Sequence, residues 1–207
     1  MLRWLRIYLN GFLFRLRLRD TLPAYFINRI PVKESGEELV PWQNGMVRRS
    51  IAERLDEACR LLPEGYSIVL REGFRPAARQ RALRLETEER LRLQHPELTP
   101  AGLERLADRF CARRSGHRTG GAVDVELYCR NSPADCGAGY LEFSRRSSNA
   151  TSDLSCEAAA NRRLLLRAMC AAGFVNYPPE YWHFCYGDRM YAAYCGRKYA
   201  IYGELEQ

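Results

Sequence analysis

The spacing between His117 and Asp124 restricts the path of this chain more than any other feature of the sequence. Both residues belong to the segment SGHRTGGAVD, residues 115–124. Seven residues of extended strand would hold the two side chains more than about 20 Å apart. Gly120 and Gly121 lie between them and adopt backbone angles that other residues avoid. Bringing both side chains to one site therefore needs a tight turn at the glycines, directly before a strand.

A second histidine in an acidic and aromatic context, His183, ends the segment EYWH at residues 180–183. Histidine and aspartate are residue types that bind zinc, so the candidate ligands are His117, Asp124 and His183. Three protein ligands leave a fourth position for water. Glu180 is expected beside the metal without binding it, where a carboxylate takes a proton from water and delivers it to a leaving amine. The sequence thus predicts one zinc ion per chain at a hydrolytic site.

Each of these residues also has an ordinary structural explanation. His117 and His183 are also compatible with buried structural histidines, Asp124 with a turn cap, and Glu180 with the surface. The metal hypothesis is favoured because the two segments complement each other. Residues 115–124 supply two candidate ligands, and residues 180–183 supply the third ligand and the candidate base. The remaining histidine, His95, precedes a proline at a predicted helix end and is expected at the surface.

Arg75 is the candidate for a fixed positive charge at the site. It stands where a predicted strand gives way to a helix that Pro76 opens. An arginine there would stabilise the oxyanion of a tetrahedral intermediate. The alternative is a surface arginine that only precedes the helix.

The remaining pattern predicts one α+β domain, since 207 residues suit a single core. Apolar residues recur every four positions from Val47 to Cys59, as on one face of a helix. The segment 131–153 is rich in Ser, Gly, Asn and Asp and is expected to be a long loop. The predicted helices cover residues 47–59, 76–95, 100–113 and 157–172, and the predicted strands cover 66–70, 122–127 and 181–184.

The net charge of +7 does not indicate a nucleic-acid partner, because the basic residues are scattered through predicted helices. Lysine occurs only at positions 33 and 198. Arginine supplies the remaining positive charge and suits bidentate contacts with carboxylates, so an anionic small ligand fits the composition.

The eight cysteines form no C-x-x-C pair, which argues against a zinc ribbon or a redox motif. Their even number also allows a disulfide framework. Several lie among apolar residues of predicted helices, where free cysteine behaves as a small hydrophobe. We therefore expect reduced thiols and a cytoplasmic location.

The first 29 residues are basic and aromatic and form an N-terminal extension. They contain no cleavage site of a secretory signal, and their apolar run is too short to span a bilayer. A strand or helix packed on the domain is the favoured interpretation. The alternative is an amphipathic segment, residues 1–20, that contacts a membrane surface.

Taken together, the segments resemble the VanX-like D-alanyl-D-alanine dipeptidase family of zinc D,D-peptidases. The likeness runs from about residue 30 to 203, so residues 30–207 are interpreted as the catalytic domain. The family pattern G-[YF]-R-P occurs at residues 73–76. The patterns S-x-H-x-x-G-x-A-x-D and E-x-W-H are matched by Ser115, His117, Gly120, Ala122 and Asp124, and by Glu180, Trp182 and His183.

The resemblance implies a compact α+β fold with a small antiparallel sheet flanked by helices and zinc in a central cleft. It also implies that Ser115 binds the carboxylate of a small peptide or amide substrate. One position departs from the family. Where the family has an Asp that pairs with the ammonium of the dipeptide, this chain has Leu141, between Tyr140 and Glu142. Glu142 is a candidate replacement for that Asp.

Three functions are compatible with these residues. The first is zinc-dependent hydrolysis of D-alanyl-D-alanine or a related dipeptide in cell-wall metabolism. The second keeps the chemistry but acts on an N-blocked or specialised amide, because Leu141 removes the ammonium partner. The third is a zinc module that binds peptidoglycan fragments without cleaving them. Nothing in the sequence predicts an oligomeric state.

Overall fold

The computed structural model describes residues 24–142 and 144–206, in which helices and strands are mixed along the chain. This arrangement confirms the α+β class. In chain order the elements are α2 (Ala24–Ile27), β1 (Leu39–Trp42), β2 (Gly45–Arg48), α3 (Arg49–Arg60), β3 (Tyr66–Glu72), α4 (Ala77–Gln94), α5 (Pro100–Phe110), η1 (Gly116–Thr119), β4 (Ala122–Cys129), β5 (Ser132–Pro133), η2 (Arg145–Ser147), α6 (Cys156–Ala171), β6 (Val175–Asn176), β7 (His183–Cys185) and α7 (Arg189–Tyr194).

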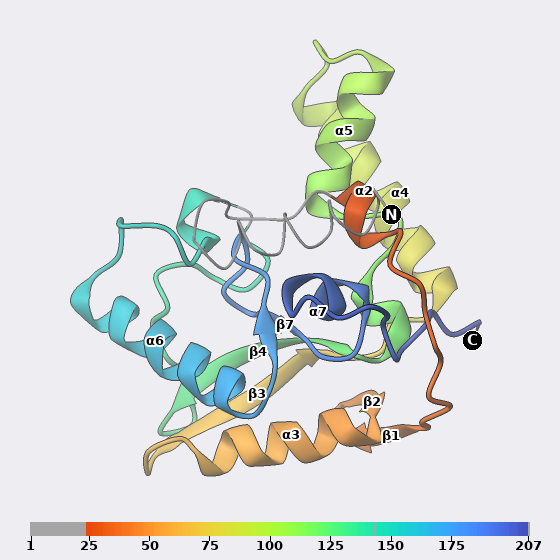
Figure 1. Ribbon diagram of the computed structural model, residues 1–207. Coiled ribbons are helices and arrows are strands. Elements are labelled where there is room, and N and C mark those ends of the chain that lie inside the picture. The colour runs from red at the N-terminus through yellow and green to blue at the C-terminus, as the bar shows by residue number, and fades with distance from the viewer. Residues whose placement is uncertain (1–23, 143, 207) are drawn as a thin grey trace.

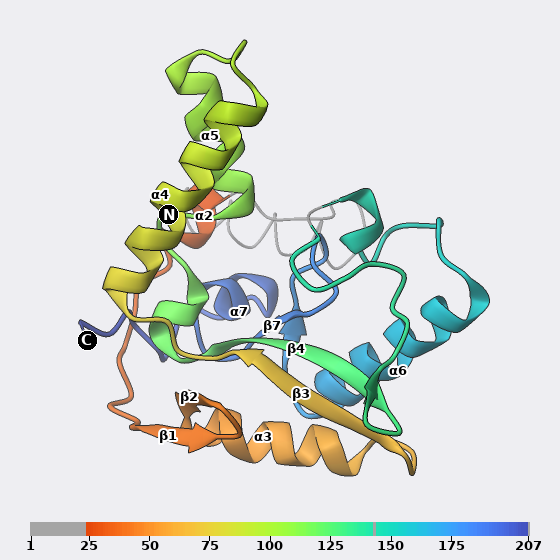
Figure 2. The same ribbon diagram turned by 180° about the vertical axis from the view of Figure 1, so that it is seen from behind.

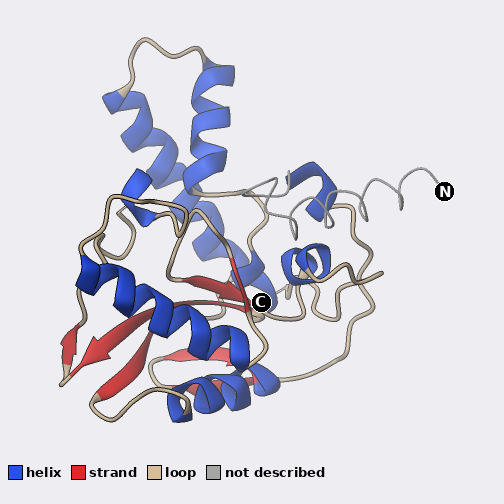
Figure 3. Cartoon of the chain, turned by 60° about the vertical axis from the view of Figure 1, so that its left-hand side comes forward, coloured by secondary structure: helices blue, strands red, loops and turns tan. Residues whose placement is uncertain are grey.

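The main sheet is small and antiparallel, as expected. Its strands follow the order β3-β4-β7-β6, and the short β5 also pairs with β4. β1 and β2 form a separate hairpin. Figures 1 and 3 show α3 and α6 packed around these strands. The central strand β4 thus has neighbours on both edges, which places it at the middle of the fold.

Residues of β4 alternate between the core and the opposite face of the sheet, as extended backbone requires. Val123, Val125 and Leu127 belong to the same buried cluster as apolar side chains of α3 and α6. Burying a side chain of this size contributes about 1.5–3 kcal/mol relative to its exposure. A one-residue slip of register would exchange these side chains for Asp124 and Glu126, so the core fixes Asp124 on the other face.

Helices α4 and α5 form a hairpin that projects from the body (Figures 1 and 2). α4 follows directly on Pro76, as predicted. The side chain of Thr99 caps α5 by accepting a hydrogen bond from the Gly102 N–H. α5 ends at Phe110, three residues before the predicted end at 113, because Cys111 has extended backbone angles. The shorter helix leaves residues 111–115 free to lead back to the sheet.

The structure corrects the start of the first predicted helix. Val47 lies in β2, opposite Val40 of β1, and the helix begins at Arg49. Val47 is fully buried in the same core as Ile51, which explains why it continued the apolar spacing. The predicted loop 131–153 also contains β5 and η2.

All eight cysteines are free thiols, as expected. The cytoplasmic location remains a prediction. Among residues 24–142 and 144–206, no helix has both the length and the apolar character needed to cross a bilayer. Residues 1–20, for which membrane-surface contact was the alternative interpretation, lie outside the described residues, and the boundary at residue 29 stays a prediction. Within the extension, α2 packs against α7.

Candidate metal centre and active site

A single turn of 3-10 helix brings His117 to Asp124. His117 lies in η1, and Gly120 ends that turn in the left-handed conformation, with φ +71°. The chain then reverses into β4, which carries Asp124. The distance from His117 Nε2 to Asp124 Oδ1 is 3.3 Å. The tight turn predicted at the glycines is therefore present, and Ser115 starts it by accepting a hydrogen bond from the His117 N–H.

His183 reaches the same place from the neighbouring strand. It is directly opposite Asp124 in the antiparallel β4–β7 pair, and its Nδ1 lies 2.9 Å from Asp124 Oδ1. The rings of His117 and His183 are nearly perpendicular, with centroids 5.0 Å apart. One donor atom from each of the three residues lies within 4.8 Å of the others, and no other such cluster occurs in the described part of the chain.

Two further groups orient these donors. The backbone carbonyl of Gly73 lies 2.9 Å from His117 Nδ1 and orients the ring so that Nε2 faces the cluster. The Tyr140 hydroxyl donates to Asp124 Oδ2 at 3.1 Å. A Cβ at Gly73 would lie 2.4 Å from the carbonyl oxygen of Met46, so only glycine fits this close approach. The cluster is thus held from outside as metal ligands commonly are.

The electrostatics of the cluster keep Asp124 ionised. Burial alone would raise the pKa of Asp124, but the charge of His117 and hydrogen bonds from both histidines hold it well below its usual value. Burial would lower the pKa of His183, whereas its hydrogen bond with Asp124 raises it. A buried carboxylate facing two imidazoles is a set of donors that favours a divalent cation.

Glu180 lies beside this cluster and not within it, as expected for a base. Its backbone N–H donates to the Tyr177 carbonyl at 2.9 Å, and its own carbonyl accepts from the side-chain amide of Asn176 at 3.0 Å. Asn176 also donates to the His183 carbonyl, so one amide fixes the loop that carries both residues. Burial raises the pKa of Glu180, and the charge of His183 offsets this only in part. A raised pKa suits a proton acceptor working near neutral pH.

Arg75 stands at the end of β3 and is held on two sides. Its Nε and Nη2 bind the carboxylate of Glu72, and its Nη1 donates to Gln80 Oε1 at 2.7 Å. Glu72 is opposite Asp124 in the β3–β4 pair, so Glu72, Asp124 and His183 lie side by side across three strands. The Arg75 backbone N–H also donates to the His117 carbonyl. The arginine is therefore tied to the metal cluster through the sheet and the backbone.

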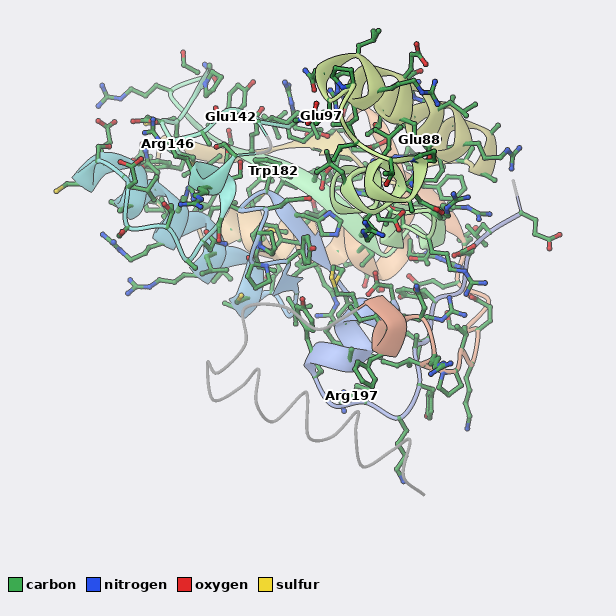
Figure 4. All side chains as sticks on the ribbon, turned by 90° about the horizontal axis from the view of Figure 1, so that it is seen from above. Glu88, Glu97, Glu142, Arg146, Trp182 and Arg197 are labelled. Carbon is green, nitrogen blue, oxygen red and sulfur yellow. The ribbon has the colours of Figure 1, made fainter. Side chains whose placement is uncertain are left out.

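One cavity of about 560 Å³ contains most of these groups. Its walls include Arg75, Ser115, His117, Asp124, Leu141, Glu180 and His183. Tyr140 and Glu142 are not among them. Tyr140 points at Asp124, whereas Glu142 is exposed on the outer loop and accepts hydrogen bonds from the Gly139 N–H and the Ser144 hydroxyl (Figure 4).

The sequence did not reveal several residues of this site. Gln80, Asp188 and Ile27 line the cavity, and Asn176 supports the Glu180 loop. The burial of Gln80, four positions into α4, is seen only in the structure. The substrate-binding roles expected for Ser115, Tyr140, Leu141 and Glu142 stay predictions.

Comparisons with known proteins show which family the chain resembles. Residues 36–199 match the Peptidase_M15 family model, described as D-ala-D-ala dipeptidase. The D-alanyl-D-alanine dipeptidase of Enterococcus faecium is 30% identical over 149 residues, covering 68% of this chain and 73% of that protein. The D-alanyl-D-alanine dipeptidase of Streptomyces coelicolor is 33% identical over 131 residues, covering 58% and 62%.

A solved structure of VanYB in complex with D-Alanine-D-Alanine is similar in fold. Its TM-score is 0.51 at 19% sequence identity, and the match covers 78% of this chain and 84% of VanYB. At this identity the similarity concerns the fold alone. It is consistent with the expected small antiparallel sheet flanked by helices.

Proposed function

The chain belongs to the D-alanyl-D-alanine dipeptidase family of M15 peptidases, and we propose that it hydrolyses the peptide bond between two D-alanine residues or closely related D-amino acids, with zinc as cofactor. As a member of this family it is a peptidase. One observation carries the proposal. His117, Asp124 and His183 converge within 4.8 Å, and the partly buried Glu180 lines the same cavity without joining the cluster.

Zinc fits the residues that are present. Two imidazole nitrogens and one carboxylate oxygen form a mixed donor set that zinc accepts in catalytic sites, with a fourth position left for water. We expect one ion per chain, held by His117, Asp124 and His183. When bound there, zinc would make water a stronger nucleophile and polarise the substrate carbonyl.

The side chains around the cluster support a general base mechanism. Glu180 takes a proton from the attacking water and delivers it to the leaving amine as the C–N bond breaks. One water is consumed, and the products are a carboxylate and a free amine. Arg75 lines the cavity and offers a fixed positive charge to the oxyanion that develops. Ser115, on the cavity wall, is the proposed contact for the substrate's terminal carboxylate.

The Glu180→Gln variant tests this proposal. It removes the proton acceptor but no metal ligand, so zinc content should stay near one per chain while kcat falls by about 10²–10⁴-fold. Glu89→Gln, at an exposed position of α4, is the matched control and should leave both values unchanged. The readouts are metal analysis and hydrolysis of D,D-dipeptides with free and acylated amino ends.

Two results would contradict the proposal in different ways. A Glu180→Gln variant with the parental rate would remove Glu180 from the mechanism. A zinc-loaded parent that binds D,D-peptides but cleaves none of them would favour a non-catalytic binding module. The free thiols support a reducing compartment as the place of action.

A further inference from the structure

Each acidic side chain that lines the cavity in the described part of the chain already has another role or partner, so no carboxylate is left to pair with a substrate ammonium. Five acids line it in the described part of the chain, namely Asp108, Asp124, Glu180, Asp188 and Glu204. Asp124 and Glu180 belong to the candidate catalytic centre. The other three must therefore be considered one by one.

Each of these three acids already has a partner. Asp108 accepts a hydrogen bond from Arg84 at 2.6 Å, and Glu204 accepts one from Arg118 at 2.7 Å. Asp188 is buried and caps α7 by accepting a backbone N–H at 2.7 Å. An ammonium group entering the cavity would have to compete with these contacts. Its charge would otherwise lose water without gaining a partner.

The positive charges of the cavity show the opposite balance. Arg75 and Arg113 are paired with acids, whereas Arg114 and Arg189 line the cavity with no ion pair to any acid in the described residues. Two wall arginines, Arg114 and Arg189, therefore remain available to an anionic group of the substrate. A guanidinium of this kind can pair with a substrate carboxylate but not with an ammonium.

Apolar side chains occupy other parts of the wall. Leu141, Ile27 and Met190 all line the cavity. Leu141 has a left-handed backbone, with φ +61°, and is half exposed. Ile27 lies in α2, outside the residues 36–199 that match the family model.

We propose that the cavity selects D,D-dipeptide units whose amino end is blocked as an amide, with Leu141 and Ile27 contacting the blocking group and with Arg114 and Arg189 retaining the carboxylate end. This inference rests on the proposed function and names its substrate class. A cavity of about 560 Å³ falls in the range that encloses drug-sized ligands, which leaves room beyond a dipeptide. The shared chemistry is an amide in place of the ammonium, supplied either by an acyl group or by a further amino acid.

The test compares three substrates with the full-length, zinc-loaded protein. These are D-alanyl-D-alanine, its N-acetyl derivative, and an N-acetylated tripeptide ending in D-alanyl-D-alanine. We expect kcat/KM to favour the N-acetyl dipeptide over the free dipeptide by about 10- to 100-fold. A further gain with the tripeptide would identify a peptidyl substrate, and a loss would identify a small acyl group.

Substitutions in the cavity wall test which residues determine the preference for blocked over free dipeptides. Leu141→Asp should shift it toward the free dipeptide, and its backbone tolerates the change because Asp adopts positive φ more readily than Leu. Ile27→Ala should lower kcat/KM for the blocked substrates more than for the free one. Leu93→Asp, at a position of α4 that is 75% exposed, is the matched control and should keep the parental preference. Calorimetry with Glu180→Gln gives a second readout, since the blocked dipeptide should also bind more tightly.

The outcomes separate the two proposals. A parent that cleaves the free dipeptide faster than both blocked substrates overturns the inference and leaves the proposed function standing. Loss of that preference in Glu142→Ala would then make Glu142 the ammonium partner. If a zinc-loaded parent cleaves none of the three substrates, the proposed function fails, and this inference fails with it.

Discussion

Gln80 holds Arg75 in place from the first turn of α4. Its Oε1 accepts a hydrogen bond from Arg75 Nη1 at 2.7 Å, and its amide nitrogen donates to the Ala112 carbonyl at 2.7 Å. The side chain of Gln80 is buried, with 3% exposed. One amide therefore joins Arg75 to the segment that leads into Ser115. In the proposed mechanism Gln80 is a positioning residue, because it would act on the reaction through Arg75.

Replacing Gln80 with Leu should lower kcat by about 10- to 100-fold and change KM less, because Arg75 keeps Glu72 but loses its second anchor. Gln80→Glu retains the acceptor for Arg75 and should recover most of the rate. Gln94→Leu, at the exposed end of α4, is the matched control. Steady-state kinetics on all three variants measure kcat and KM separately. Equal loss of rate in the Leu and Glu variants would show that the bond to Ala112 matters instead.

Substitution of the candidate ligands should remove the metal. Alanine at His117, Asp124 or His183 leaves two protein donors, so zinc content should fall well below one per chain. His95→Ala, at a partly exposed histidine outside the cluster, should keep full occupancy. Metal analysis after dialysis against a chelator gives the result. Stoichiometric zinc in the His117→Ala/His183→Ala double variant would place the metal elsewhere.

Those parts of the site were predictable from the sequence in which the spacing of residues within a short segment limits the path of the backbone. The distance between His117 and Asp124 could be closed only by a turn at the glycines, and the structure has that turn at Gly120. The strand pairing that sets His183 opposite Asp124 completes the cluster. The two short segments therefore predicted which three residues would form the cluster, but they did not predict the distances between the donor atoms.

The supporting residues were not predictable in this way, because they act between segments far apart in the chain. Gln80 bonds to Ala112 across 32 positions, and Ile27 reaches the cavity from the extension. The apolar spacing misplaced Val47 for a related reason. A strand residue packed into the same core continues the period of the following helix, so periodicity alone does not mark the boundary.

Tyr140 should tune zinc affinity through Asp124. Its hydroxyl donates to Asp124 Oδ2, and partners of this kind commonly change metal affinity by about 10- to 100-fold. Tyr140→Phe keeps the ring and its edge contact with Trp182 but removes the hydrogen bond. Zinc titration against a competing chelator should show the weaker binding. Tyr199→Phe, at an exposed tyrosine, serves as control, and equal affinity in both variants would exclude this role.

Arg162 stabilises the loop that carries Tyr140 and Leu141. Its Nε donates to the Cys136 carbonyl at 2.6 Å, its Nη1 donates to the Ser148 carbonyl at 2.8 Å, and its Nη2 donates to the Arg146 carbonyl. The guanidinium is buried in α6 and also lies over the ring of Tyr181. A single side chain therefore ties both ends of the loop to the helix.

The Arg162→Leu variant should lower the free energy of unfolding by about 2–4 kcal/mol, because three carbonyl groups lose a charged donor at once. Arg163→Leu, at the exposed neighbouring position, should change it by less than about 0.5 kcal/mol. Urea denaturation of the two variants measures the difference. An unchanged slope of the unfolding free energy against urea concentration would locate the effect in the folded state. The loosened loop should also weaken the contact from Tyr140 to Asp124, so Arg162→Leu should bind zinc less tightly than Arg163→Leu. Equal stability and equal zinc affinity in the two variants would mean that the loop is held by other contacts.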